Sequence, residues 1–238
     1  MTGHLLDLDQ VDAGYGALRV VWDVSIQILA GEWVVLVGAS GAGKTTLVRT
    51  IAGLIWPQAG TVRFDGRDIS RLPAHLRVRA GLAMIPEGRR LFGGMSVGDN
   101  LTLGGFAELD KAERARRLAY VYELFPALAA RRRQIAATMS GGEQQMCAVA
   151  RALMLSPKLL IIDELSFGLA PSIVDAIIEA LILVRKSGTT LFVIDQDVSI
   201  GVGLADRAYV MRSGRLVMEG EADRVLRDPL LHREYIGA

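Results

Sequence analysis

The sequence predicts an α/β protein in which a mixed sheet is joined to an N-terminal antiparallel sheet and interrupted by a helical segment. Apolar and polar side chains alternate at Leu6–Val11 and Leu18–Leu29, as in strands with one buried face. Later apolar runs of four or five residues, such as Trp33–Val37, contain no polar residue. They alternate along the chain with segments of helical periodicity, which is typical of a parallel sheet. From about Gly88 to Leu155 only the helical pattern remains.

Each element follows from its local pattern. Further strands are expected at Thr61–Phe64, Gly81–Ile85, Leu159–Ile162, Thr190–Ile194, Ala208–Met211 and, after a Ser213-Gly214 turn, Arg215–Glu219. Helices are expected from near Lys44, at Lys111–Leu124, at Glu143–Leu155 and from Pro171 to Lys186. These assignments predict one domain, 1–238, made of a core (1–87 and 156–238) and a helical subdomain (88–155).

Composition excludes several functional classes. The 27 Lys and Arg residues nearly balance the 26 Asp and Glu residues, so no overall field draws the 238-residue chain to nucleic acid. The single cysteine, Cys147, allows no internal disulfide or cysteine metal cluster, and we expect it to be a core residue on a helix. The three histidines, His4, His75 and His232, are too scattered to form a metal site.

The apolar runs are also too short to cross a bilayer, which takes about 20 residues. The first ten residues, MTGHLLDLDQ, carry acids where a secretory signal would be basic and then apolar. We therefore expect no transmembrane helix and a location on the cytosolic side of the membrane.

A phosphate-binding loop is the most specific motif. Residues Gly38, Ala39, Ser40, Gly41, Ala42, Gly43, Lys44, Thr45 and Thr46 contain the pattern G-x-x-x-x-G-K-[ST] between a buried strand and a helix. Glycines let backbone N–H groups converge on phosphate oxygens at the helix N-terminus. Lys44 would reach the β- and γ-phosphates, and Thr45 would offer its hydroxyl to Mg²⁺. The loop predicts binding of ATP with magnesium.

Two acids end the strand Leu159–Ile162. Carboxyl ends of parallel strands share one edge of the sheet, so Asp163 and Glu164 should lie beside the phosphate loop. Asp163 is expected to hold Mg²⁺ through water, and Glu164 to polarise the water that attacks the γ-phosphate.

A second candidate anion site precedes the helix near residue 143. Ser140, Gly141 and Gly142 offer a hydroxyl and free amides, while Ser140 and Glu143 also match a capping box, which is the purely structural alternative. One nucleotide does not need two such sites in one chain. The second site is therefore expected to serve a nucleotide held by another copy.

Taken together, these residues resemble the ATP-binding subunits of ABC transporters. The Walker A, signature and Walker B motifs of that family appear in order as GASGAGKTT, MSGGEQQ and LLIIDE. The resemblance implies a head-to-tail dimer, with ATP between one Walker A loop and the opposing residues 140–143. It also implies membrane permease subunits as partners, a solute-binding protein acting indirectly and a peripheral place on the cytoplasmic face of the membrane.

The resemblance assigns smaller features as well. Tyr15 matches the aromatic residue that stacks on adenine, and a surface tyrosine is the alternative. Glu87 stands at the Q-loop position and is expected near the metal with Thr45 and Asp163. Gln196 stands at the switch position, usually a histidine, and is expected to act in catalysis with Glu164 and Lys44.

Four features together resemble the ATPases of branched-chain amino acid importers: PEGRRLF, SGGEQQM, GLAP and the glutamine at the switch. Importers of urea or another small solute remain an alternative, as does a pairing with a sibling ATPase in place of a second copy. Two departures from that pattern are Leu165, where proline is usual, and Asp195-Gln196-Asp197, where Glu-Gln-Asn is commoner. They leave open a nucleotide-gated dimerisation module with little turnover.

Other ATPase classes fit less well. Repair and chromosome-organising ATPases insert a long coiled coil between Walker A and the signature, and the stretch from Lys44 to Ser140 has no room for heptads. A small-molecule phosphotransferase would leave the signature segment unexplained. The apolar residues Leu91, Phe92 and Met95 are the expected docking surface for a permease helix, with packing inside the helical subdomain as the alternative.

Overall fold

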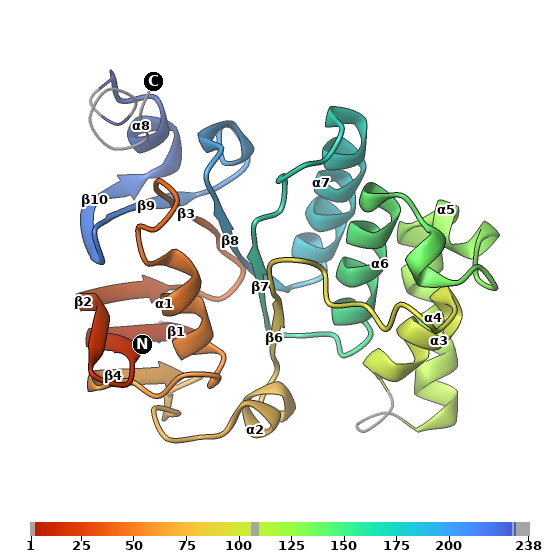
Figure 1. Cartoon of the computed structure of the whole chain (residues 1–238), viewed down its shortest axis with the longest axis horizontal. Coiled ribbons are helices and arrows are strands. Elements are labelled where there is room, and N and C mark those ends of the chain that lie inside the picture. The colour runs from red at the N-terminus through yellow and green to blue at the C-terminus, as the bar shows by residue number, and fades with distance from the viewer. Residues whose placement is uncertain (1–2, 106–109, 230, 232–238) are drawn as a thin grey trace.

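A computed structural model describes residues 3–105, 110–229 and 231. They form two sheets beside a lobe of helices (Figure 1). The strands are β1 (Leu6–Tyr15), β2 (Leu18–Ile28), β3 (Trp33–Val37), β4 (Ala59–Phe64), β5 (Arg67–Asp68), β6 (Leu82–Ile85), β7 (Leu159–Asp163), β8 (Thr190–Asp195), β9 (Arg207–Arg212) and β10 (Arg215–Glu221). The predicted α/β class and mixed sheet are confirmed.

The larger sheet has six strands in the order β10-β9-β3-β8-β7-β6. All neighbours are parallel except β10, which returns antiparallel to β9. Every residue of β3, β7 and β8 is buried, because helices or the second sheet cover both faces. Burial on both faces explains why these strands appear in the sequence as uninterrupted apolar runs.

The smaller sheet has the order β2-β1-β4-β5 and is entirely antiparallel. The alternation seen in the sequence is preserved as alternating burial along β2. Strand β5 was not foreseen because it has only two residues. It follows a tight turn in which Asp65 and Gly66 both have positive φ, 50° and 74°.

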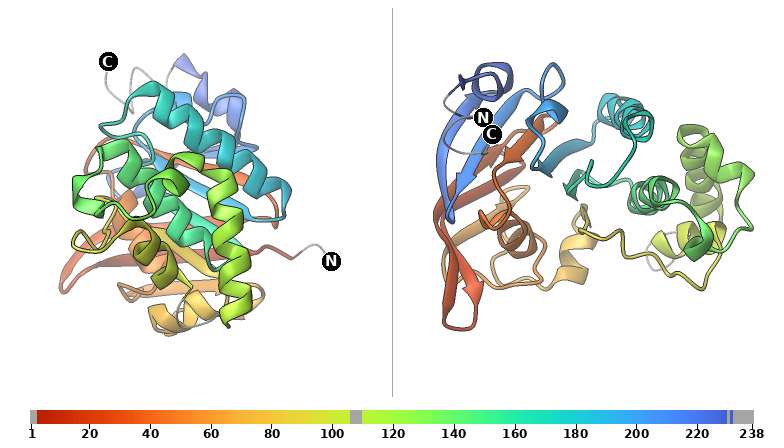
Figure 2. Two further views of the ribbon diagram at one scale, coloured as in Figure 1. Left: turned by 90° about the vertical axis from the view of Figure 1, so that its right-hand side faces the viewer. Right: turned by 45° about the horizontal axis from the view of Figure 1, so that its top comes forward.

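The helices are α1 (Lys44–Ile51), α2 (Ala74–Arg79), α3 (Val97–Gly104), α4 (Lys111–Leu124), α5 (Pro126–Ala130), α6 (Gly141–Leu153), α7 (Pro171–Lys186) and α8 (Ala222–Leu226). The predicted bounds of α6, 143–155, are wrong by two residues at each end. Its start is fixed by the Ser140 cap, and it ends at Leu153. Helices α3, α4, α5 and α6 form the lobe beside the strands, as Figure 1 and the right-hand view of Figure 2 show. Among the described residues, no helix has the length and apolar character needed to span a bilayer.

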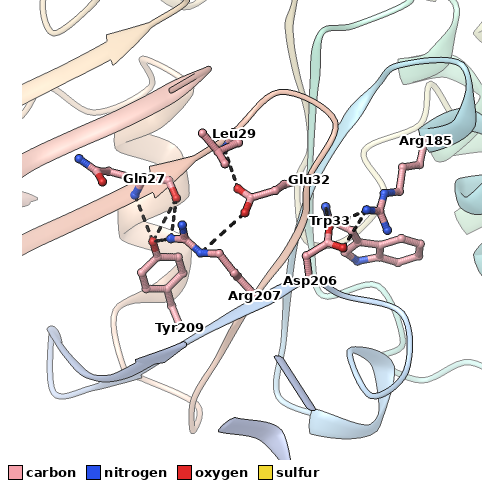
Figure 3. Close-up of polar contacts among 8 residues, drawn as sticks. All are labelled: Gln27, Leu29, Glu32, Trp33, Arg185, Asp206, Arg207 and Tyr209. Atoms are coloured by element: carbon pink, nitrogen blue, oxygen red, sulfur yellow. Dashed lines mark hydrogen bonds and ion pairs between the residues drawn. The ribbon is translucent and has the colours of Figure 1, made fainter. Parts of the chain in front are cut away.

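Polar contacts join the two sheets at the edge remote from the phosphate loop (Figure 3). The Tyr209 hydroxyl donates to the Gln27 carbonyl (3.0 Å) and accepts from the Gln27 N–H (3.2 Å), so β9 is tied to β2. Asp206 accepts from the Trp33 N–H (2.8 Å) and from Arg185 of α7 (2.6 Å). These contacts fix how the smaller sheet and α7 sit on the β3–β9 pair.

Arg77 on α2 caps the far end of the phosphate-loop helix. Its guanidinium is fully buried and donates to the carbonyls of Thr50 (2.8 Å) and Ile51 (2.7 Å) in the last turn of α1, and to those of Leu72 (2.7 Å) and Ser70 (3.2 Å). Burial lowers the pKa of Arg77 to about 10, yet the group stays charged at neutral pH. A cation suits this place because α1 carries its negative dipole end there.

Replacing Arg77 should therefore destabilise the fold. Arg77→Met removes a donor from four carbonyls, of which that of Thr50 keeps the Gly53 N–H (3.1 Å), and we expect the free energy of unfolding to fall by about 3 kcal/mol or more. Urea denaturation measures this change, with Arg67→Met on the exposed strand β5 as the matched control. Equal midpoints for the two variants would contradict the capping role.

Candidate functional site

The phosphate loop joins β3 to α1, where the sequence places it. A cleft of about 210 Å³ lies over it and is lined by Val20, Ser40, Gly41, Ala42, Gly43, Lys44, Thr45, Thr46, Glu87 and Glu164. Gly43 has φ 103°, and a Cβ on Gly38 would lie 2.2 Å from the Met211 carbonyl oxygen. Both positions therefore require glycine. Glu87 and Glu164, predicted from separate motifs, meet the loop in this cleft.

Lys44 is held inside the loop. Its ammonium donates to the carbonyls of Gly38 (2.6 Å) and Ala39 (3.0 Å), and its side chain is buried. Burial lowers the pKa of Lys44, while the nearby carboxylates of Glu164 and Asp163 oppose that shift. The ammonium must exchange these carbonyls for phosphate oxygens when a nucleotide enters the cleft.

The expected metal corner is formed by Thr45 and Asp163. The Thr45 hydroxyl lies 3.4 Å from one carboxylate oxygen of Asp163, and the other oxygen is buried without a hydrogen-bond partner in the described part of the chain. Burial raises the pKa of Asp163 to about 6; the Thr45 hydrogen bond acts against this shift, and the charges of Glu164 and Glu87 add to it. An orphaned carboxylate oxygen beside a hydroxyl fits Mg²⁺, which keeps waters and binds phosphates.

The metal corner is sparse in protein ligands. Within the described ranges, no three His, Cys, Asp or Glu side chains are grouped to hold a metal by themselves. Such a corner suits a cation that arrives with a nucleotide, since phosphates and waters complete the shell. Thr45 and Asp163 would hold the ion here, which would stabilise charge on the transferring phosphate.

Glu164 and Gln196 form a direct pair. The Gln196 side-chain amide donates to Glu164 Oε1 at 2.8 Å. The structure thus brings Gln196 into direct contact with Glu164, the residue with which it is expected to act. An amide has two N–H donors, so one can hold Glu164 while the other remains for a phosphate oxygen.

Tyr15, at the end of β1, lies against α1. The residue is 47% exposed, and its hydroxyl accepts from Arg49 (3.1 Å) and lies 3.5 Å from the Thr46 hydroxyl. An exposed ring fixed beside the loop is suited to stacking on a base. The role itself stays a prediction.

The signature segment lies away from the cleft, and none of its residues lines it. Ser140 and Glu143 form the complete capping box at the start of α6, so the structural alternative is present. The Ser140 hydroxyl accepts from the Glu143 N–H (3.3 Å), and Glu143 accepts from the Ser140 N–H (2.9 Å). A Cβ on Gly142 would lie 2.8 Å from Ile173 of α7, so only glycine fits.

Sequence reasoning missed two polar residues of the site. Asp195, treated only as a departure from a family pattern, is buried at the end of β8 and bonds Ser166 of the preceding loop. Like Asp163, it ends a buried strand at the carboxyl edge of the sheet, and that position was the available signal. Leu165 is fully buried in the core, which explains an apolar residue there.

Comparisons with known proteins agree with this geometry. The ABC transporter family model matches residues 21–166, more than half of the chain. The high-affinity branched-chain amino acid transport ATP-binding protein BraG of Pseudomonas aeruginosa is 43% identical over 233 residues, covering 98% of this chain and 100% of BraG. The lipopolysaccharide export system ATP-binding protein LptB of Escherichia coli K12 is 36% identical, covering 94% and 93%.

Solved structures show the same fold. A nucleotide-free ATP-binding cassette from an ABC transporter superposes with a TM-score of 0.85 at 24% identity, covering 95% of this chain and 96% of that one. An ATP-binding subunit of an ABC transporter superposes with a TM-score of 0.83 at 29% identity, covering 94% and 92%. The chain belongs to the ABC transporter family and is an ATP-binding subunit. Proteins of this family bind ATP and hydrolyse it to power transport, as predicted.

Lys44 should be needed for nucleotide affinity. Lys44→Ala removes the one cation in the sequence of the loop 38–46, so we expect the Kd for MgATP to rise about 10- to 100-fold. Isothermal calorimetry measures this change, with the exposed Lys158→Ala as control. Unchanged affinity of Lys44→Ala would show that the phosphates bind elsewhere.

Because the switch position carries Gln196 and no histidine, the ATPase rate should not change with pH through the titration of an imidazole group. A glutamine does not titrate near neutral pH, and neither His4 nor His75 lines the cleft; His232 lies outside the described residues. We expect a flat profile of kcat between about pH 7 and 8 for the parent chain, above the range in which Asp163 titrates, and a new inflection in Gln196→His. A step in the parent that disappears in His75→Gln would contradict the assignment.

Proposed function

We propose that this chain is the ATPase of an importer for branched-chain or related amino acids. The identity to BraG over the full length of both chains supports this cargo class. A second relative named for branched-chain amino acid transport, the probable transport ATP-binding protein LivF of Archaeoglobus fulgidus, is 33% identical over 91% of this chain. The glutamine at the switch position points the same way.

In this proposal two ATPase chains sandwich two MgATP head to tail. Lys44 and residues 38–46 bind the phosphates, Thr45, Asp163 and Glu87 hold Mg²⁺, and Tyr15 stacks on adenine. Residues Ser140, Gly141, Gly142 and Glu143 meet the partner's nucleotide. Glu164 polarises the attacking water, and the Gln196 amide holds the Glu164 carboxylate at 2.8 Å.

The permease would dock in a groove between the core and the helical lobe. This groove, of about 340 Å³, is lined by Val78 of α2, the β6 segment, Phe92, Leu103 of α3 and Arg151 of α6. Phe92, from the predicted docking segment, is 53% exposed there, whereas Leu91 packs against the core. An exposed aromatic beside a groove suits an amphipathic helix, and docking there would keep the chain peripheral to the membrane.

The sandwich predicts an ATP-dependent dimer. Glu164→Gln should slow turnover about 100-fold or more while retaining ATP, so dimers should accumulate on size exclusion. In that background, Ser140→Asp keeps a good helix cap but sets a negative charge against the opposing phosphate. It should abolish the dimer, whereas the neutral control Ser140→Asn should preserve it. Failure of Glu164→Gln to dimerise at saturating MgATP would instead favour a sibling chain as partner.

The cargo is tested by reconstitution. The chain is assembled with candidate branched-chain permease subunits in proteoliposomes, and ATPase activity is measured with solute-binding protein loaded with leucine or with urea. We expect leucine-loaded protein to stimulate the rate and Phe92→Asp to remove the stimulation without lowering the basal rate. Stimulation by the urea-loaded form alone would favour the alternative importer. If only lipopolysaccharide export components stimulate the ATPase, the proposal of an importer is wrong.

A further inference from the structure

Two loops leave neighbouring strands at the edge that carries the phosphate cleft. Strands β7 and β8 are parallel and pair Asp163 with Ile194, and the Glu164 N–H extends this pairing by donating to the Ile194 carbonyl (2.9 Å). Glu164 then turns the first loop with a φ of 60°, a left-handed conformation that is unfavourable for a residue with a side chain. Such a conformation persists only where surrounding contacts hold it.

The carboxylate of Asp195 supplies those contacts. One oxygen accepts from the Ser166 N–H (3.0 Å), and the other accepts from the N–H groups of Gln196 (2.7 Å) and Asp197 (3.0 Å). The Ser166 hydroxyl lies 3.0 Å from both oxygens. With 4% of its surface exposed, Asp195 clamps the loop that carries Glu164 to the loop that carries Gln196.

We infer that Asp195 is a positioning residue for ATP hydrolysis, which sets the Glu164–Gln196 pair through its hydrogen bonds to both loops. This inference rests on the catalytic roles proposed for Glu164 and Gln196. Leu165, buried between Glu164 and Ser166, anchors the clamped loop in the core. Asp195 accepts from the N–H groups of Ser166 and Gln196, and the Gln196 side-chain amide donates to Glu164 Oε1. Together these bonds leave the reacting carboxylate little freedom to turn.

The clamp requires a carboxylate. Each oxygen of Asp195 faces backbone N–H donors, and only an acid accepts on both sides. An asparagine would accept on one side and turn its NH₂ group toward N–H donors on the other, releasing one loop. Asp195→Asn, nearly identical in volume, therefore separates the hydrogen-bonding role from packing.

Asp197 provides a matched control two residues away. Its carboxylate accepts from the Ser199 N–H (2.9 Å) and caps the short 3₁₀ turn Val198–Ile200, without a bond to the loop of Glu164. Asp197→Asn changes the same chemical group in the same segment. It should leave turnover and nucleotide affinity near those of the parent chain.

The experiment compares Asp195→Asn, Ser166→Ala, their combination and Asp197→Asn in the purified full-length chain. Steady-state kinetics give kcat and KM for MgATP, and calorimetry with MgADP counts folded sites. We expect Asp195→Asn to lower kcat about tenfold or more with KM within about threefold and one site per chain. The double variant should lose about as much as Asp195→Asn alone, because both changes break one clamp.

Glu164→Gln is measured alongside to separate two failures. If Glu164→Gln retains the parent kcat, the role of Glu164 is wrong whatever Asp195 does. If Glu164→Gln loses turnover while folded Asp195→Asn keeps it, the clamp is wrong. If Asp195→Asn does not fold, Ser166→Ala provides the test, because it removes the hydroxyl contacts to Asp195 and keeps the backbone bond. We expect it to lower kcat severalfold while every chain still binds MgADP. A kcat equal to that of the parent chain would overturn the inference.

Discussion

The parallel pairing of β3, β8 and β7 is the constraint on which the site depends. Register places Val37 beside Asp195 and Asp163 beside Ile194, so the phosphate loop and both acidic loops leave the sheet side by side. Because these strands are buried on both faces, polar groups collect where they end. The cleft therefore lies at the carboxyl edge of the parallel sheet, whose strands are predicted by the apolar runs in the sequence.

Local patterns predicted the fold and most of the site, whereas contacts between distant segments escaped prediction. The glycine loop, the Ser140–Glu143 cap and the acids after β7 each lie within a few residues of one another, so spacing alone revealed them. Asp195 contacts Ser166 across 29 residues, and Arg77 reaches Thr50 across 27. No periodicity encodes such pairs, and short helices such as α5 carry too few turns to show one.

Family membership and cargo rest on different parts of the molecule. The phosphate cleft and the Thr45–Asp163 corner offer groups suited to phosphate and magnesium, which every ATP-driven transporter must bind. Nothing in that chemistry distinguishes an amino acid from a lipopolysaccharide, and relatives named for both share the chain's length. In the function proposed above, partner choice would be read at the groove beside Phe92, which shares no lining residue with the phosphate cleft.

Cys147 lies on α6 within the core, with a side chain that is fully buried, and burial raises the pKa of its thiol to about 11. Only the thiolate reacts readily with alkylating reagents, so this group is both inaccessible and protonated at neutral pH. As the sequence contains no other cysteine, the native chain gives little background in thiol labelling. Spectroscopic probes can be attached through a cysteine introduced on an exposed surface without first altering the interior of the signature helix.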